Sequence, residues 1–333
     1  MKVVIPVAGE GTRLRPLTDS VPKPLLEVAG DTILGHLLRK LEPLPIEELI
    51  FVVGFKKEMI IDYVRARSST SLRVFNSKTK VRFVEQDKPA GLGYAVNLTL
   101  PYVDEGPLLI LLGDTILELD WGLVLKAKDN LLGLKEVPDP QRFGVAVLQN
   151  GRIVELEEKP GKPKSNSAIV GPYYIQELEL FKKCLSELVA GPPGVNGEWQ
   201  ITDGLVKMIK GGSVFRPLWI ERWFDCGKPE TLLETNRYLL AGLPETPRRP
   251  GSTITPPCFI APSAEVESSV IGPFVSIGER AAVRFSTLRN SIVSAGARVA
   301  DSVLEDSLVG AGAAVSGRNG RVNVGGSSEV KVL

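Results

Sequence analysis

Residues 3–18 read VVIPVAGEGTRLRPLT, and residues 22–26 add PKPLL. An apolar strand pattern runs directly into a glycine turn there, and Arg13, Arg15 and Lys23 follow within fifteen residues. Glycines let the backbone approach a ligand closely and point its N–H groups at an anion. Arginine adds forked donors that match phosphate oxygens. The stretch therefore predicts a strand followed by a phosphate-binding loop, although a G-x-G by itself also fits an ordinary βα turn with surface charges.

The first two thirds of the chain alternate strand patterns with helical patterns. Strands are expected at residues 2–8, 49–53, 81–85 and 108–112, and helices at 34–41, 57–67 and 94–98. The run at 108–112 lacks polar alternation, which favours a central strand covered on both faces. We therefore expect a doubly wound α/β domain with a mixed sheet, which binds its ligands at the carboxyl ends of the strands. Gly9, Gln86 and Asp114 fall just beyond predicted strand ends and are expected to converge on one crevice.

The C-terminal part of the chain has a different pattern. Residues 241–251 (AGLPETPRRPG) form a predicted linker between a domain at 1–240 and a second domain at 252–333. In the second domain aliphatic residues recur at steps of five or six, namely Ile254, Ile260, Val266, Ile271, Ile277, Val283, Leu288, Val293, Val299, Leu304, Val309 and Val315. This hexapeptide period predicts a left-handed parallel β-helix of about four coils, closed by residues 321–324 and the tail.

Two other structures of the C-terminal part were weighed. The aliphatic period argues against a disordered tail, and the scarcity of aromatic residues and turn pairs argues against a small sandwich. Many hexapeptide-repeat domains are acyltransferases that use a histidine base, but this one contains no histidine. We therefore expect a structural domain, for assembly or packing.

Composition and charge exclude several classes of protein. With 40 basic and 39 acidic residues among 333, no overall field favours nucleic acid or an anionic membrane. No apolar run reaches membrane-spanning length, and the N-terminus resembles a strand rather than a signal peptide. The three cysteines lie far apart and form no C-x-x-C pair, so a reducing cytoplasm is the simplest setting. The one histidine, His36, lies in a predicted helix, which argues against Ser-His-Asp and Cys-His hydrolases.

Seven further strings carry residues suited to phosphate, base and sugar recognition. They are 85–95 (EQDKPAGLGYA), 112–114 (LGD), 142–147 (RFGVAV), 153–160 (IVELEEKP), 169–173 (IVGPY), 197–204 (GEWQITDG) and 223–230 (WFDCGKPE). The amide of Gln86 can donate and accept at once, which suits a pyrimidine edge. Glu158 can accept from sugar hydroxyls, and Lys159 can neutralise a phosphate. Two carboxylates, Asp114 and Asp225, together with phosphate oxygens make the ligand set that Mg²⁺ prefers.

Together with the loop at residues 9–26, these strings resemble, in order, the motifs of sugar-nucleotide pyrophosphorylases, the nucleotidyltransferases that make NDP-sugars. The resemblance covers essentially the whole chain. Residues 134–144 (LKEVPDPQRFG) and 323–325 (NVG) look most like long-form glucose-1-phosphate thymidylyltransferases. The bifunctional glucosamine-1-phosphate uridylyltransferase/acetyltransferase would need histidines in its β-helix.

The resemblance implies a role for each matching residue. Phosphate charge would be neutralised by Arg13, Lys23 and Lys159, with Mg²⁺ on Asp114 and Asp225. The nucleotide-binding residues would be Ala8, Gly9, Gly11, Thr12, Gln86 and Gly91, and the sugar-binding residues Gly144, Glu158 and Gly171. The implied reaction joins an NTP, expected to be dTTP, to a hexose 1-phosphate, expected to be glucose 1-phosphate, and releases pyrophosphate. The sugar phosphate oxygen would attack the α-phosphorus in line, so no protein nucleophile is needed.

One departure and two alternatives accompany this interpretation. Asn196 precedes Gly197 where close relatives often carry arginine, which puts one phosphate or packing contact in doubt. UTP or another hexose remains open, because uracil and thymine differ by a methyl group that an apolar pocket discriminates by roughly 1–3 kcal/mol. A non-catalytic, sugar-nucleotide-binding regulator also remains open, although such proteins usually lose the arginine or the aspartates kept here. A homo-oligomer is expected, since β-helix domains often stack between subunits.

Overall fold

The computed structural model describes residues 1–69, 79–243 and 248–331, which form two compact units. Unit 1 comprises Met1–Gly9, Leu38–Gly113 and Leu117–Trp223, and unit 2 comprises Glu10–Leu37, Asp114–Ile116 and Phe224–Leu333. The units are interleaved along the chain, so the loop after the first strand belongs to unit 2. The predicted division at 1–240, 241–251 and 252–333 stays a prediction, and residues 244–247 of the predicted linker lie outside the described residues.

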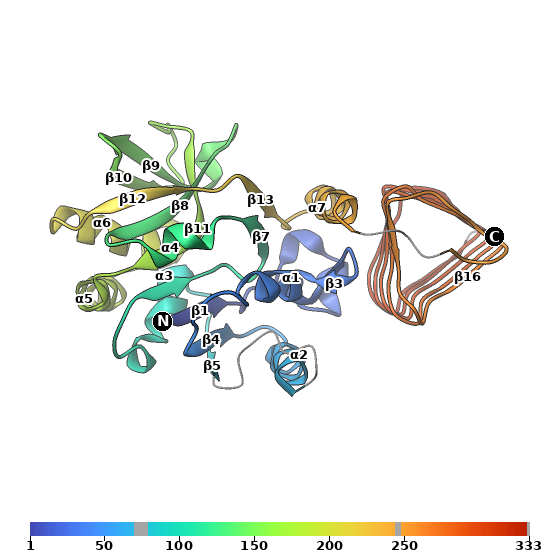
Figure 1. Cartoon of the computed structure of the whole chain (residues 1–333), viewed down its shortest axis with the longest axis horizontal. Helices are drawn as coiled ribbons and strands as arrows, with labels where there is room; N and C mark the ends of the chain where they lie inside the picture. Colours follow the sequence, from blue (N-terminus) through green and yellow to red (C-terminus); the bar gives the residue numbers. More distant parts are fainter. Residues whose placement is uncertain (70–78, 244–247, 332–333) are drawn as a thin grey trace. The chain divides into compact units, whose positions relative to one another are not determined.

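Unit 1 is built on a nine-stranded mixed sheet, as predicted, in the order β5-β4-β1-β6-β11-β8-β12-β10-β9 (Figure 1). The strands are β1 (Lys2–Pro6), β4 (Glu48–Val53), β5 (Lys80–Glu85), β6 (Leu108–Ile110), β8 (Asn130–Glu136), β9 (Gly144–Gln149), β10 (Arg152–Glu158), β11 (Ser167–Ile175) and β12 (Phe215–Trp219). The first four strands in this order are mutually parallel, and β11 pairs antiparallel with both β6 and β8. The carboxyl ends of β5, β4, β1 and β6 therefore share one edge.

Both faces of this sheet are covered. Val3, Val4 and Ile5 are consecutive on β1, point alternately to opposite faces, and are all fully buried. Helices α3 (Leu92–Asn97), α5 (Leu178–Ala190) and α6 (Ile201–Lys210) share a core with Val4 and Ile110. Other elements outside the large sheet are α1 (Ile33–Lys40), α2 (Lys57–Ser69), α4 (Trp121–Leu125), β7 (Thr115–Glu118), β13 (Arg222–Asp225) and the 3₁₀ helices η4 (Leu100–Tyr102), η5 (Pro140–Arg142) and η6 (Val195–Gly197). The predicted helices are confirmed, with ends that differ by one or two residues.

The C-terminal part of unit 2 consists of three parallel five-stranded sheets, as in a β-helix, and Figure 1 shows their triangular outline. The first sheet contains β14 (Thr253–Ile254), β17 (Val270–Ile271), β20 (Thr287–Arg289), β23 (Val303–Glu305) and β26 (Asn319–Gly320). The second contains β15 (Cys258–Ile260), β18 (Val275–Ile277), β21 (Ile292–Val293), β24 (Leu308–Val309) and β27 (Asn323–Val324). The third contains β16 (Glu265–Glu267), β19 (Ala282–Arg284), β22 (Arg298–Ala300), β25 (Ala314–Ser316) and β28 (Glu329–Lys331). All twelve predicted aliphatic positions lie on these strands and pack in one core.

The predicted number of coils was one too low for the described residues. Each sheet has five strands, because β26, β27 and β28 form a further coil over residues that the sequence suggested were a closing segment. Gly320 is paired with Leu304 and occupies the position of an aliphatic residue. The missing side chain interrupts the hexapeptide period there and hides the last coil.

The rest of unit 2 surrounds the loop after β1. This loop contains the short 3₁₀ helices η1 (Thr12–Leu14), η2 (Leu17–Asp19) and η3 (Lys23–Leu25), and a hairpin of β2 (Glu27–Val28) and β3 (Asp31–Thr32). A second hydrophobic core joins Leu26 of the loop, Leu233 of helix α7 (Pro229–Ala241), and Ile292 and Leu308 of the β-helix. The β-helix therefore packs directly against the loop that carries the deciding sequence.

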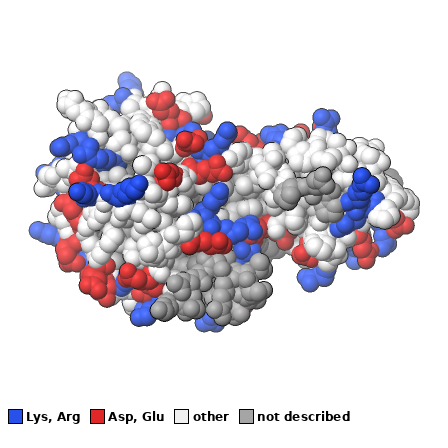
Figure 2. Space-filling model, viewed as in Figure 1, with Lys and Arg blue, Asp and Glu red and all other residues white. Residues whose placement is uncertain are grey.

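Charges are mixed on the surface. On the face shown in Figure 2, the lysine and arginine side chains are interspersed with aspartate and glutamate side chains. In the described part of the chain, no helix is long and apolar enough to cross a membrane. Cys184, Cys226 and Cys258 are buried free thiols.

Candidate active site

In unit 2 an ammonium group lies between two carboxylates. Lys23 Nζ donates to Asp114 Oδ2 at 2.6 Å and lies 3.6 Å from Asp225 Oδ1. Lys23 comes from η3, Asp114 follows strand β6, and Asp225 ends strand β13. The Lys23 side chain is 6% exposed, while Asp114 is 42% and Asp225 20% exposed. Three residues that the sequence placed in separate motifs are therefore brought into one charged cluster.

The electrostatics of this cluster follow from burial and pairing. Burial works against the charge of Lys23, but the two carboxylates outweigh it and raise the pKa of its ammonium. Burial also raises the pKa of the neighbouring Cys226 thiol to about 12, so that this cysteine stays protonated and unreactive at neutral pH. The cluster thus contains two acids and one base, with a net negative charge that is open to solvent at Asp114.

The donor set of this cluster fits Mg²⁺. Among the described residues, no group of three or more His, Cys, Asp or Glu side chains could hold a metal ion without help. Mg²⁺ is usually held by one or two carboxylates, with water and substrate phosphate oxygens supplying the other ligands. Asp114 and Asp225 provide two hard carboxylates of this kind, close to the same ammonium.

Arg13 borders the same cluster. It lies exposed in η1, which Gly11 introduces in a left-handed conformation, at φ 66°. A Cβ on Gly11 would lie 2.9 Å from Lys23 Cβ, so this glycine allows the two turns to approach closely. A Cβ on Gly227 would meet Arg13 Nη2 at 2.9 Å and Asp225 Oδ1 at 2.8 Å. The Arg13 guanidinium and the Asp225 carboxylate therefore both border the space that a side chain at Gly227 would fill.

Unit 1 contains a second group of predicted site residues. Thr202 Oγ1 donates to Glu158 Oε2 at 2.7 Å, and Lys159 Nζ lies 3.8 Å from Glu158 Oε1. A Cβ on Gly144 would meet Glu158 Oε2 at 3.0 Å and Thr202 Oγ1 at 3.1 Å. Burial raises the pKa of Glu158, although the Thr202 hydroxyl and the Lys159 ammonium favour its charged form. The predicted residues Gly144, Glu158 and Lys159 therefore lie close together. Thr202, which was not predicted, is hydrogen-bonded to Glu158.

The predicted base-binding motif is also ordered in unit 1. Gly91 begins α3 at φ 97°, a conformation that favours glycine, and a Cβ there would lie 2.6 Å from the Trp199 carbonyl oxygen. That carbonyl accepts from Gly93 N at 2.8 Å, and Trp199 N donates to the Ala90 carbonyl at 2.9 Å. Two strings far apart in the sequence, 85–95 and 197–204, are therefore hydrogen-bonded side by side.

The remaining predicted residues lie at the strand ends and on β11. Gln86 follows β5 directly, and its N–H donates to Val53 O at 2.8 Å. Ala8 and Gly9 follow β1, and Thr12 begins η1. Gly171 lies in an irregular part of β11 at φ 64°. Gly9 and Gln86 belong to unit 1 and Asp114 belongs to unit 2. That these three residues share a crevice therefore stays a prediction.

Comparison with known proteins identifies the family of the chain. Residues 2–242 match the family described as nucleotidyl transferase. The chain belongs to this family. The glucose-1-phosphate thymidylyltransferase of Streptomyces griseus is 32% identical over 335 residues, which cover 90% of this chain and 89% of that protein. The bifunctional protein GlmU of Methanocaldococcus jannaschii is 38% identical over 244 residues, 72% of this chain and 54% of that protein. The chain spans about half the length of this relative.

Solved structures share the nucleotidyl transferase fold. A putative glucose-1-phosphate thymidylyltransferase from Bacillus anthracis, in complex with a sucrose, superposes with a TM-score of 0.60 at 28% identity, covering 72% of this chain and 95% of that one. A UDP-glucose pyrophosphorylase complexed with UDP-glucose gives a TM-score of 0.62 over 73% of this chain and 99% of that one. At 24% identity, the second likeness shows the fold alone.

Two residues that contact the predicted site residues were not singled out in the sequence. Thr202 fixes Glu158, and Gly133 leaves room for the Gly171 carbonyl, which would lie 1.9 Å from a Cβ there. Thr202 lies inside the string 197–204, so that string was the available signal, whereas nothing in the sequence marks Gly133. Asn196, where the sequence departs from the family it resembles, is exposed at φ 59°, a conformation that asparagine tolerates well.

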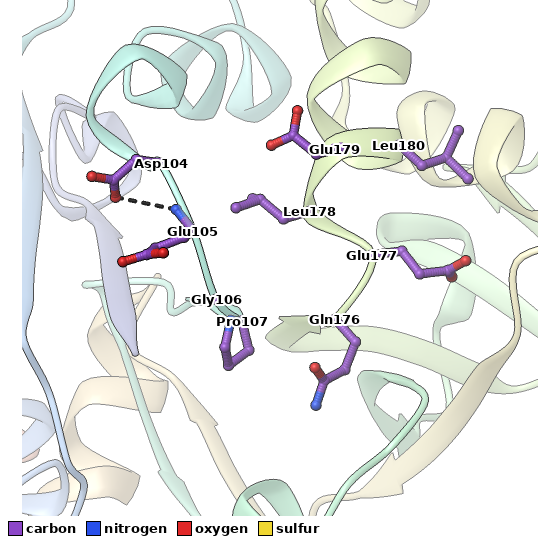
Figure 3. A pocket seen from close by; sticks show the side chains of 9 residues that line it. All are labelled: Asp104, Glu105, Gly106, Pro107, Gln176, Glu177, Leu178, Glu179 and Leu180. Carbon is purple, nitrogen blue, oxygen red and sulfur yellow. Dashed lines mark hydrogen bonds between the residues drawn. The ribbon is translucent and has the colours of Figure 1, made fainter.

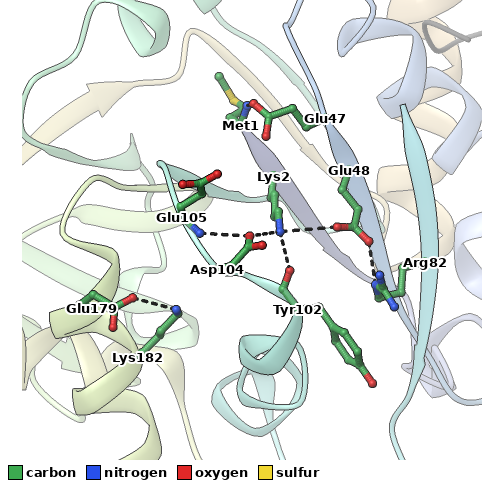
Figure 4. Close-up of polar contacts among 10 residues, drawn as sticks. All are labelled: Met1, Lys2, Glu47, Glu48, Arg82, Tyr102, Asp104, Glu105, Glu179 and Lys182. Atoms are coloured by element: carbon green, nitrogen blue, oxygen red, sulfur yellow. Dashed lines mark hydrogen bonds and ion pairs between the residues drawn. The ribbon is translucent and has the colours of Figure 1, made fainter. Parts of the chain in front are cut away.

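Two cavities lie away from this site, at the edge formed by the amino ends of the parallel strands. One, of about 530 Å³, is lined by residues 104–107 and 176–180 (Figure 3). The other, of about 540 Å³, includes Lys2, Glu48 and Asp104, and Figure 4 shows Lys2 held by Glu48, Asp104 and the Tyr102 carbonyl. Neither cavity is lined by a predicted site residue. Their acidic side chains are largely engaged in ion pairs and local hydrogen bonds.

Proposed function

We propose that this chain is a sugar-1-phosphate nucleotidyltransferase that joins dTTP to glucose 1-phosphate and releases pyrophosphate. The observation that carries the proposal is the cluster of Lys23, Asp114 and Asp225, a buried ammonium between two carboxylates at the end of the phosphate-binding loop. Family membership supports the reaction class. The thymidylyltransferase of S. griseus supports the specificity, because its similarity extends over both the catalytic and the repeat regions.

The chain's own residues would act by positioning and charge neutralisation. Asp114 and Asp225 would hold Mg²⁺, which supplies positive charge to the reacting phosphates when bound. Arg13 would bind the β- and γ-phosphates and so stabilise the leaving pyrophosphate. Lys23 would contact the α-phosphate, and Lys159 the sugar phosphate.

The nucleoside and the hexose would be held by uncharged groups and one carboxylate. Ala8, Gly9, Gly11, Thr12, Gln86 and Gly91 would bind the nucleotide. Glu158 would accept from the hexose hydroxyls, with Gly144 and Gly171 letting the backbone approach the ring. The Thr202 hydroxyl donates to Glu158 Oε2, and Glu158 Oε1, which lies 3.8 Å from Lys159 Nζ, would accept from the hexose.

A second candidate differs only in its substrates. Membership of the nucleotidyl transferase family is equally compatible with UTP and with another hexose 1-phosphate as substrates of the same chemistry. An acetyl-transfer step using a histidine base is not part of this candidate. His36 is the chain's one histidine, and it lies in α1 with Nε2 2.8 Å from Val28 O, outside the β-helix.

The test is pyrophosphate release in the presence of Mg²⁺. Each of dTTP, UTP, GTP, ATP and CTP is paired with the 1-phosphates of glucose, mannose, galactose and glucosamine. A maximum for dTTP with glucose 1-phosphate is expected. A maximum for another pair would keep the mechanism and change the specificity. No release with any pair, from folded protein, would contradict the proposal and favour a regulatory sugar-nucleotide-binding protein.

Two further parts of the proposal concern the β-helix. We propose that its coil is left-handed, in keeping with the hexapeptide period. We also propose that the protein is a homo-oligomer, which analytical ultracentrifugation of the full chain tests directly.

A further inference from the structure

The buried side chain of Asn236, in helix α7, joins three segments of unit 2. Its Oδ1 accepts from Ala29 N at 2.9 Å and from Ser276 Oγ at 2.6 Å, and its Nδ2 donates to Phe274 O at 3.3 Å. Ala29 lies in the turn of the β2–β3 hairpin, while Ser276 lies on β18 and Phe274 just before it. Asn236 is fully buried. One amide therefore ties the hairpin, the helix and the β-helix together.

The two segments that this amide joins to the β-helix lead directly to the candidate active site. The hairpin begins four residues after Lys23, and Leu26 N donates back to Lys23 O at 3.1 Å. Helix α7 begins four residues after Asp225. Cys226 is fully buried, with Sγ 3.5 Å from Thr235 Oγ1 on that helix. The backbone on either side of the cluster is thus anchored in elements that the amide holds in register.

A second contact between the loop and the β-helix lies near the first. Glu27 Oε2 accepts from Ala295 N at 2.9 Å, and a Cβ on Gly278 would lie 2.6 Å from the same oxygen. Further along the coil, a Cβ on Gly325 would lie 2.7 Å from Pro16 O. Gly278 and Gly325 therefore occupy the positions on the β-helix where the loop approaches it. A larger residue at either position would require the loop or the coil to move.

We infer that the β-helix is part of the frame of the active site, and that Asn236 is a positioning residue. By fixing the hairpin against α7, it sets the approach of the Lys23 ammonium to the Asp225 carboxylate. The inference rests on the proposed function and assigns the β-helix a role beyond assembly. Misplacing catalytic groups by about 1 Å can cost a large factor in rate, so a remote hydrogen bond that fixes this spacing affects binding of the metal–nucleotide.

The matched variants are Asn236→Ala, Ser276→Ala and the control Ser302→Ala. Ser302 is also a buried serine of the β-helix, but its hydroxyl bonds only within the coil, to Ala300 O at 2.7 Å and Arg318 N at 3.1 Å. We expect the KM for the Mg²⁺–nucleotide to rise about tenfold in Asn236→Ala, which loses three neutral hydrogen bonds, and about threefold in Ser276→Ala, which loses one of them. The KM for the hexose 1-phosphate should stay unchanged in all three.

Amide hydrogen exchange of the free protein provides a readout that needs no turnover. Exchange at residues 23–33 and 225–235 should be faster in Asn236→Ala and Ser276→Ala than in the wild type, whereas Ser302→Ala should affect only the coil. The inference is overturned if Asn236→Ala matches Ser302→Ala in both KM values, or if its extra exchange stays within the β-helix. If the wild type releases no pyrophosphate, the proposed function is contradicted. The hydrogen-exchange pattern of the variants then tests, without turnover, whether Asn236 fixes the segments on either side of the cluster.

Discussion

The cluster around Lys23 and the group around Glu158 use carboxylates in opposite ways. In unit 2, two partly exposed aspartates stabilise a buried ammonium and raise the pKa of Lys23. In unit 1, a single carboxylate that is 11% exposed has its pKa raised by burial, and its nearest polar partners are a hydroxyl and a more exposed lysine. The Lys23 cluster brings several charged groups together, whereas the Glu158 group holds one hydrogen-bond acceptor that is largely shielded from solvent.

This difference indicates which part of the chemistry each region supports. Concentrated, partly exposed charge binds ions and phosphates, whose attraction depends on distance and dielectric. A shielded acceptor with a fixed hydroxyl partner recognises a neutral polyol, because the ligand must replace lost hydration with well-placed hydrogen bonds. Substitutions in the Lys23 cluster should therefore act mainly on kcat and metal dependence, and substitutions in the Glu158 group mainly on sugar binding.

The largest expected effect is that of Asp225→Asn. Loss of this carboxylate removes one of the two proposed Mg²⁺ ligands, and we expect kcat to fall by roughly 10²–10³-fold, as for other preorganised charged groups. The measurement is the initial rate of pyrophosphate release over a Mg²⁺ titration. Asp129→Asn, which loses only a surface ion pair with Arg216, is the control. Full Mg²⁺-dependent activity in Asp225→Asn would remove Asp225 from the site.

Arg13→Ala should have the next largest effect. We expect about a 10²-fold loss of kcat/KM for the nucleotide, because the leaving pyrophosphate loses its guanidinium partner. Arg15→Ala is a matched control in the same loop, since Arg15 is already engaged by Glu10 and Asp19, each at 3.3 Å. Equal rates for the two variants would argue that Arg13 has no special role.

Lys23→Met tests the charge balance without turnover. Removing the ammonium leaves two carboxylates facing each other, so the free energy of unfolding should fall by about 1–3 kcal/mol, less than for a fully buried pair because Asp114 is 42% exposed. Added Mg²⁺ should then raise the Tm of the variant more than that of the wild type. Thermal unfolding with and without Mg²⁺ measures this, and equal shifts would mean that the carboxylates do not bind the ion.

The smallest expected effect is a pH dependence at Glu158. Because the pKa of Glu158 is raised, its carboxylate becomes protonated at a higher pH than an ordinary glutamate. The KM for the hexose 1-phosphate should rise as the pH falls through this raised pKa, since the protonated group is a weaker acceptor. Glu158→Gln should raise this KM about tenfold at pH 7, the value of one or two hydrogen bonds, and remove the pH dependence. Ionised Glu158 opposes folding, since its folded pKa exceeds its unfolded one, so Glu158→Gln should not lower the Tm at neutral pH. A lower Tm with unchanged KM would assign Glu158 a structural role instead.

The sequence predicted the secondary structure well where the hydrophobic pattern is formed by residues that are close together along the chain. The run at residues 108–112 predicted a central strand, because consecutive apolar residues require cover on both faces, and the structure forms this strand over Leu108–Ile110. The aliphatic period from Ile254 to Val315 predicted the repeat domain, since each repeat buries the same position. The last coil escaped prediction because Gly320 interrupts that period.

The sequence by itself determined the elements, the reaction class and the residue types available for phosphate and metal. Only the tertiary structure decided that Asp114 and Asp225 share the ammonium of Lys23, that Thr202 holds Glu158, and that Asn236 ties the β-helix to the hairpin in the loop after β1. Strand and helix periods follow from interactions within a few residues along the chain. These contacts join residues that are tens to hundreds of positions apart, and they exist only once burial has brought their elements together.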